Sequence, residues 1–143
     1  MAGRNPTEQV GRQIVALAGQ CVPDRSLDAQ AAGLGSVYGI YVDLQAIPKP
    51  ARDRFLRTIV DKPRVFKTPA DVIGALLRAI VYRGVLGNSD RAKLSRDTKA
   101  LAYAARLGVR PEEFVARIRE KGHGVQAWAE RERVRLAEET SND

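Results

Sequence analysis

Residues 68–83 constrain the fold of this chain more than any other segment. Thr68-Pro69-Ala70-Asp71 is typical of a helix start, because a hydroxyl N-cap, an early proline and an acid three residues on suit the first turn. The apolar residues that follow cover well over half of a helical wheel: Val72, Ile73, Ala75, Leu76, Leu77, Ala79, Ile80 and Val81. A helix with so wide an apolar arc must be covered on most sides. We therefore predict that it forms the centre of a bundle, with a homodimer seam as the alternative.

Similar signals predict an all-α fold, in which a compact bundle of about six helices forms one domain over residues 1–143. Apart from 68–83, the segments with helical signals are 7–19, 26–45, 50–60, 90–107, 111–121 and 125–139. Thr7 and Ser89 are expected to be N-caps, and Gly108 is expected to end a helix in the left-handed conformation. Residues 1–6 and 139–143 lack periodicity and are expected to be loose ends.

The spacing of apolar residues predicts which side of each helix is buried. In the first helix the expected buried residues are Val10, Ile14, Val15, Leu17 and Ala18. In helix 90–107 they are Ala100, Leu101, Ala104, Ala105 and Leu107. The last helix has mixed charge, so we expect it to be largely solvated and docked by Trp128.

Residues 36–45 are compatible with two kinds of secondary structure. Tyr38, Ile40, Val42 and Leu44 alternate along the chain, which is a strand pattern, and the available partner for a short strand at 37–44 is 64–67. A lone strand needs such a partner, whereas small residues in this segment permit close helix packing. We favour a helix, with the short β element as the alternative.

Composition excludes several classes of protein. Cys21 is the only cysteine, so an intramolecular disulfide is impossible, and with one histidine in the chain a zinc site of Cys and His ligands is not expected. No run of apolar residues is long enough to span a membrane, and no signal peptide is apparent. We expect a cytoplasmic protein without metal or cofactor. His123 and Cys21 have no acid placed in a known catalytic order, so we do not expect an enzyme.

The positive charge is concentrated in the middle third of the chain. Residues 45–99 contain thirteen Lys and Arg against five Asp and Glu, a difference of +8, while the whole chain has a formal net charge of +7. Such a segment attracts phosphate backbones or acidic protein surfaces. The candidate nucleic-acid-binding residues are Lys49, Arg52, Arg54, Arg57, Lys62, Arg64, Lys67, Lys93, Arg96 and Lys99. Phe66 or Tyr82 would add base stacking if exposed.

Residues 100–118 resemble the helix-turn-helix of bacterial repressors. Ala104 precedes Gly108 by four residues and Phe114 follows it by six, a spacing that suits a small residue, a turn and an apolar anchor. The second helix would begin at Pro111 with Glu112 and Glu113, whose carboxylates would oppose DNA phosphates. We therefore favour two packed helices over a DNA-reading element.

Together these patterns favour a small basic nucleic-acid-binding protein, of the kind of a bacterial DNA-binding transcriptional regulator or accessory factor. DNA is favoured over RNA as the partner. The alternative is a protein-interaction module or a homodimeric adaptor or anti-activator, in which helix 68–83 forms the seam and the basic residues dock an acidic partner.

Overall fold

The computed structural model describes residues 6–18, 27–60, 66–83, 86–120 and 122–141. These residues form seven α-helices and one 3-10 helix, and no strand occurs among them, which confirms the predicted all-α bundle. The helices are α1 (Pro6–Ala18), α2 (Leu27–Gln45), α3 (Lys49–Ile59), α4 (Pro69–Ile80), α5 (Asn88–Leu107), η1 (Pro111–Glu113), α6 (Phe114–Ile118) and α7 (Val125–Ser141). Within the described part of the chain, no helix combines the length and apolar character that a membrane span requires.

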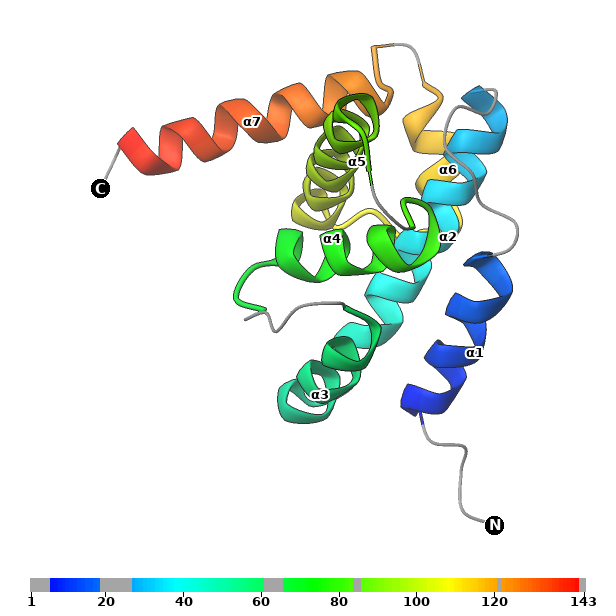
Figure 1. Cartoon of the computed structure of the whole chain (residues 1–143). Coiled ribbons are helices and arrows are strands. Elements are labelled where there is room, and N and C mark those ends of the chain that lie inside the picture. Colours follow the sequence, from blue (N-terminus) through cyan, green and yellow to red (C-terminus); the bar gives the residue numbers. More distant parts are fainter. Residues whose placement is uncertain (1–5, 19–26, 61–65, 84–85, 121, 142–143) are drawn as a thin grey trace.

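Helix α4 lies in the middle of the bundle. It contacts α1, α2, α3 and α5, with α3 below it and α5 above it in the view of Figure 1. Helix α7 packs on α5, and its C-terminal half extends away from the bundle (Figure 1). The remaining helices are therefore arranged around α4, as the wide apolar arc of 68–83 predicts.

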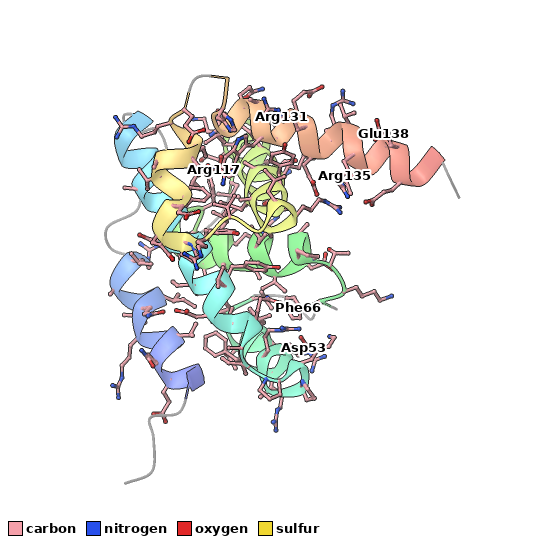
Figure 2. The ribbon with its side chains drawn as sticks, turned by 180° about the vertical axis from the view of Figure 1, so that it is seen from behind. Asp53, Phe66, Arg117, Arg131, Arg135 and Glu138 are labelled. Carbon is pink, nitrogen blue, oxygen red and sulfur yellow. The ribbon has the colours of Figure 1, made fainter. Side chains whose placement is uncertain are left out.

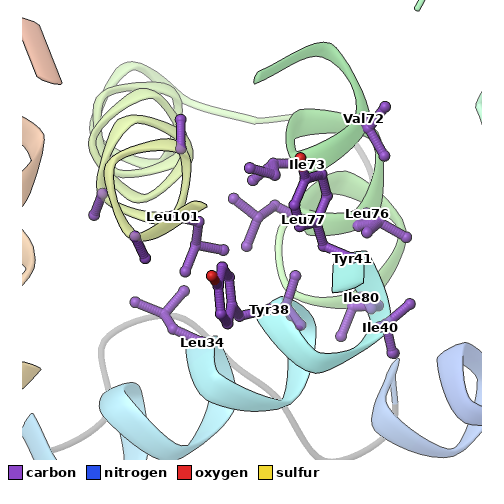
Figure 3. Packing of buried hydrophobic residues seen from close by; sticks show 14 of the residues in the cluster. Leu34, Tyr38, Ile40, Tyr41, Val72, Ile73, Leu76, Leu77, Ile80 and Leu101 are labelled. Atoms are coloured by element: carbon purple, nitrogen blue, oxygen red, sulfur yellow. The ribbon is translucent and has the colours of Figure 1, made fainter. Parts of the chain in front are cut away.

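The apolar arc of α4 is buried within the chain itself. Its buried residues are Val72, Ile73, Ala75, Leu76, Leu77 and Ile80. Figure 3 shows several of them packed against Tyr38 of α2 and Leu101 of α5. This result confirms the bundle-centre interpretation, because intramolecular contacts already cover the arc that the homodimer alternative requires.

The start of α4 has the predicted cap, and its end comes earlier than expected. Thr68 Oγ1 accepts a hydrogen bond from Asp71 N at 3.3 Å, and Asp71 Oδ2 accepts one from Thr68 N at 3.0 Å, which completes a capping box. The helix ends at Ile80 instead of residue 83.

Residues 36–45 are helical, so the favoured interpretation is confirmed and the strand alternative is wrong. They lie in α2, which buries Val37, Tyr38, Tyr41 and Leu44 in a pattern of three- and four-residue steps. The small residue at Gly35 permits the close packing of α2 on α6, since a Cβ atom there would lie 3.2 Å from Phe114. In the proposed partner segment, residues 66–67 are not in a strand and 64–65 lie outside the described residues.

Two expected N-caps are wrong. Helix α1 already begins at Pro6, so Thr7 lies within its first turn. Helix α5 begins at Asn88, with Gly87 in the cap position and no side-chain cap, so Ser89 lies inside the helix. Gly108, in contrast, has the predicted left-handed conformation at φ 69°.

Two residues expected in the core are exposed. Val15 is 76% exposed, because α1 faces the bundle with Val10 and Ile14 and turns Val15 outward. Leu107 is 46% exposed, because it is the last residue of α5, where the helix leaves the packed region. Apolar spacing finds a helix face but does not show how much of that face other helices cover.

The C-terminal region is anchored by the predicted tryptophan. Trp128 is fully buried, its ring meets Phe114 edge-on at 5.7 Å, and its Nε1 donates a hydrogen bond to His123 Nδ1 at 2.9 Å. Helix α7 then continues to Ser141, so it includes residues 139–141 of the segment 139–143, which lacks periodicity in the sequence. Helix α6 ends at Ile118, before the expected boundary near residue 121.

The central position of α4 predicts a large effect of truncating its core. Replacing Leu76, which is completely buried, with Ala should lower the free energy of unfolding by about 2–5 kcal/mol, because it leaves a cavity among packed helices. Urea denaturation measures this change. The control Val15→Ala alters an exposed side chain and should change stability by less than about 0.5 kcal/mol. Equal effects of the two substitutions would contradict the proposed core.

Candidate functional site

Helix α3 exposes two of the predicted basic residues. Leu56 is fully buried against the core, while Arg54 and Arg57 lie three residues apart on the solvent side. Neither arginine has an ion pair with a described residue. Arg52 is half-buried, as its place at the apolar edge predicts, and donates to Gln45 Oε1 at 3.3 Å.

Lys49 joins the start of α3 to the segment that leads into α4. Its Nζ lies 2.5 Å from Asp53 Oδ2 and donates to the carbonyl oxygen of Phe66 at 3.2 Å. Figure 2 shows Asp53 and Phe66 close together at this end of the molecule. Lys67 follows directly and is exposed, so Lys49 has a local structural role while Lys67 faces solvent.

Helices α4 and α5 add exposed cations that the predicted set omitted. Arg78 lies one turn beyond Gly74, and a Cβ atom at Gly74 would lie 3.9 Å from Thr98 of α5, so Arg78 lies on the side of α4 toward α5. On α5, exposed Arg91 lies two turns before Lys99, whose Nζ donates to Ser95 Oγ at 3.2 Å. Arg78 lies on the part of the helical wheel of 68–83 that the apolar arc leaves free, and this position could have identified it as an exposed cation from the sequence.

Arg96 is a counter-ion inside the structure. Asp97 is 1% exposed, and its carboxylate accepts hydrogen bonds from Tyr82 Oη at 2.5 Å and from Arg96 Nε at 3.1 Å. Burial raises the pKa of Asp97 above its ordinary value, whereas the Tyr82 hydrogen bond and the charges of Arg96 and Lys93 oppose that shift. Burial and the hydrogen bond to Asp97 raise the pKa of Tyr82. Arg96 therefore neutralises a buried acid of α5 that is hydrogen-bonded to Tyr82, the second residue after α4.

The two aromatic residues considered for base stacking are buried. Phe66 is 4% exposed and Tyr82 is 3% exposed. Their rings fill the space between helices, and the Tyr82 hydroxyl is occupied by Asp97. The expectation that they would add stacking if exposed therefore does not apply.

The repressor-like segment forms a turn followed by a short element. Val109 N donates to Ala104 O at 3.1 Å across the left-handed Gly108, which closes the end of α5. After η1, α6 has five residues, which at about 1.5 Å per residue is less than two turns. Phe114 is fully buried and stacks on Tyr38 of α2 at 5.2 Å. This geometry matches two packed elements, with the second one held against α2.

The predicted cations differ in whether other residues of the chain engage them; Lys93 and Lys99 both interact with described residues. Lys49, Arg52 and Arg96 have the local contacts described above, and Lys62 and Arg64 lie outside the described residues. Other exposed cations of α3, α4, α5 and the adjoining loops have side chains that form no ion pair or hydrogen bond with a described residue. We call them the basic surface: Arg54, Arg57, Lys67, Arg78, Arg83 and Arg91.

Comparisons with known proteins do not place the chain in a family. No protein-family model matches it, and neither a curated protein nor a solved structure shows a significant match. The interpretation of the basic surface therefore depends on its charges and contacts.

The buried Asp97 predicts a pH-dependent term in stability. A carboxyl whose pKa is higher in the folded state holds its proton more tightly when folded, so this term favours folding below pH 3.8 and is lost as the pH rises through the folded pKa. The variant Asp97→Asn lacks this titration. We expect the free energy of unfolding of the natural chain to fall relative to that of Asp97→Asn as the pH rises above 3.8. Urea denaturation over a pH series tests this, and a constant difference between the two proteins would contradict it.

Proposed function

We propose that this chain is a nucleic-acid-binding protein of regulatory or accessory type, which holds a phosphate backbone through the basic surface. The observation that carries the proposal is that six exposed Lys and Arg residues of the middle third lack an acidic partner in the described chain. Exposed unpaired cations retain their full charge toward solvent, and several together attract a polyanion.

The C-terminal third supports this interpretation by contrast. Four arginines of this region form ion pairs within the chain: Arg106, Arg110, Arg133 and Arg135. Figure 2 shows Arg131, Arg135 and Glu138 along α7, where the two signs of charge are interspersed. Exposure and a high arginine content are therefore common to both regions, but unpaired positive charge is concentrated on α3, α4, α5 and the adjoining loops.

The chemistry of the basic surface suits phosphate contact without base reading. Five of its six members are arginine, whose planar guanidinium matches the oxygens of a phosphate with two parallel hydrogen bonds. Such contacts position a protein on a nucleic acid and carry no sequence information. Helix α6 packs on α2 and has only five residues, which is too short for a helix that reads bases in the major groove. We therefore propose binding with weak sequence preference, to duplex DNA in preference to RNA.

Binding should depend steeply on salt. Six phosphate contacts release condensed counterions, so the logarithm of the association constant should fall with the logarithm of salt concentration with a slope of about −5. Fluorescence anisotropy with a short duplex DNA and with a single-stranded RNA, measured over a salt series, gives this slope. A slope near zero, or binding to an acidic protein surface in the absence of any nucleic-acid binding, would contradict the proposal.

Removing two charges from α3 should weaken binding to every sequence. We expect the double variant Arg54→Gln and Arg57→Gln to reduce the salt slope by about 2, because each residue accounts for about one phosphate contact. Both side chains are exposed and neither forms an ion pair with a described residue, so the fold should be unaffected.

The matched control removes the same charge from α7. Arg133 and Arg135 are 58% and 57% exposed, but each lies in an ion pair. Replacing both with Gln should leave the salt slope unchanged. Equal losses of affinity in the two double variants would show that only net charge matters and that the basic surface is not the binding site.

A further inference from the structure

A cavity lies between the start of α4, the second half of α5 and the exposed half of α7. Its volume is about 460 Å³, which is within the range of about 300–1,000 Å³ typical of small-molecule sites. In Figure 1 the C-terminal half of α7 extends above the N-terminal end of α4, which supplies Thr68, Pro69 and Ala70 to the cavity lining. The cavity has no role in the nucleic-acid binding proposed above.

One wall of the cavity contains a tyrosine hydroxyl that can donate a hydrogen bond to a ligand. Tyr41 lines the cavity and is 7% exposed, and its hydroxyl makes no hydrogen bond with a described residue. Figure 3 shows its ring reaching from α2 toward the space between α4 and α5. Burial raises the pKa of Tyr41, so the hydroxyl keeps its proton at neutral pH. The hydroxyl is therefore a hydrogen-bond donor for an acceptor group of a ligand in the cavity.

The charged residues of the cavity also leave donors unused. Both carboxylate oxygens of Glu132 accept from Arg106 Nε, at 2.7 and 2.9 Å, and Glu139 Oε1 accepts from Arg106 Nη1 at 3.2 Å. These acids are therefore satisfied within the chain. Lys99 Nζ donates to the neutral Ser95 hydroxyl. The carboxylate of Glu130, which feels the charge of Lys99, is hydrogen-bonded by Arg133, so the Lys99 ammonium retains two N–H groups for a ligand. The groups of the cavity that remain available to a ligand are thus the Lys99 ammonium and the Tyr41 hydroxyl.

The remaining wall is mostly apolar. Ala102 and Ala105 of α5 contribute methyl groups, and Leu136 of α7, which is 38% exposed, lies across from them. An apolar ligand body would cover part of Leu136 and remove apolar surface from water.

We propose that this cavity binds a small apolar molecule with an anionic group such as a carboxylate. The anionic group accepts hydrogen bonds from the Lys99 ammonium, a ligand oxygen accepts one from the Tyr41 hydroxyl, and the apolar body lies against Ala102, Ala105 and Leu136. The paired Arg106 and Glu132 form a neutral end wall. A cationic ligand is disfavoured, because Lys99 repels it and the carboxylates nearby are already engaged.

Three naphthalene probes of matched size test the charge preference. Isothermal titration calorimetry should show that 2-naphthoate binds with one site per chain, while 2-naphthylmethanol binds at least about tenfold more weakly, as expected for loss of a charged hydrogen-bonded contact. The cation 2-naphthylmethylammonium should bind most weakly of the three. Equal affinities of the three probes, or no binding of 2-naphthoate, would overturn the proposal.

Substitutions on two helices locate the site. Lys99→Gln and Tyr41→Phe should each weaken 2-naphthoate binding, by about tenfold for the lysine and less for the tyrosine. Ala105→Trp should abolish binding by filling the half-buried position at the cavity wall. Arg91→Gln removes one exposed charge from the same helix outside the cavity and should leave binding unchanged. Circular dichroism establishes that each variant is folded. Retention of full affinity by folded Lys99→Gln and Tyr41→Phe would overturn the assignment.

Discussion

Burial of the apolar arc of α4 is the constraint on which the rest of the structure depends. A helix that is apolar over more than half its circumference must contact neighbours on several sides, and α1, α2, α3 and α5 provide them. Only a narrow polar strip is then left at the surface, and Arg78 lies on it. Because α3 and α5 both pack on α4, helices that are far apart in sequence contribute outward-facing cations to the same bundle.

The end of α4 is fixed by a polar contact that uses some of this positive charge. Asp97 lies in the interior, where an ionised carboxylate is costly, and Tyr82 and Arg96 supply the hydrogen bonds that reduce the cost. This arrangement ties the residues after α4 to the middle of α5. The net charge of residues 45–99 therefore overstates the charge available to a partner, since Arg96 and Lys49 are engaged within the protein.

Local signals predicted some of the features that depend on neighbouring residues, although the expected N-caps at Thr7 and Ser89 were wrong. The capping box at Thr68 and the left-handed Gly108 follow from short motifs, and both are present. Features that depend on distant packing were not predictable in the same way. The burial of Tyr82 requires Asp97, fifteen residues later, and the exposure of Val15 depends on which side of α1 other helices leave uncovered. The cavity at Tyr41 brings together residues from α2, α4, α5 and α7, a combination that no single sequence window contains.

The proposed nucleic-acid surface and the proposed ligand cavity adjoin each other but have no residue in common. Lys99 lines the cavity and lies two turns from Arg91, which belongs to the basic surface. An anion bound at Lys99 would neutralise one charge near that surface. Each Lys or Arg contact to phosphate changes the salt slope by about one, so the six unpaired cations of the basic surface would retain most of the attraction. The two proposed functions are therefore energetically separable, and any influence of the ligand on nucleic-acid binding should be limited to the part of the surface next to α5.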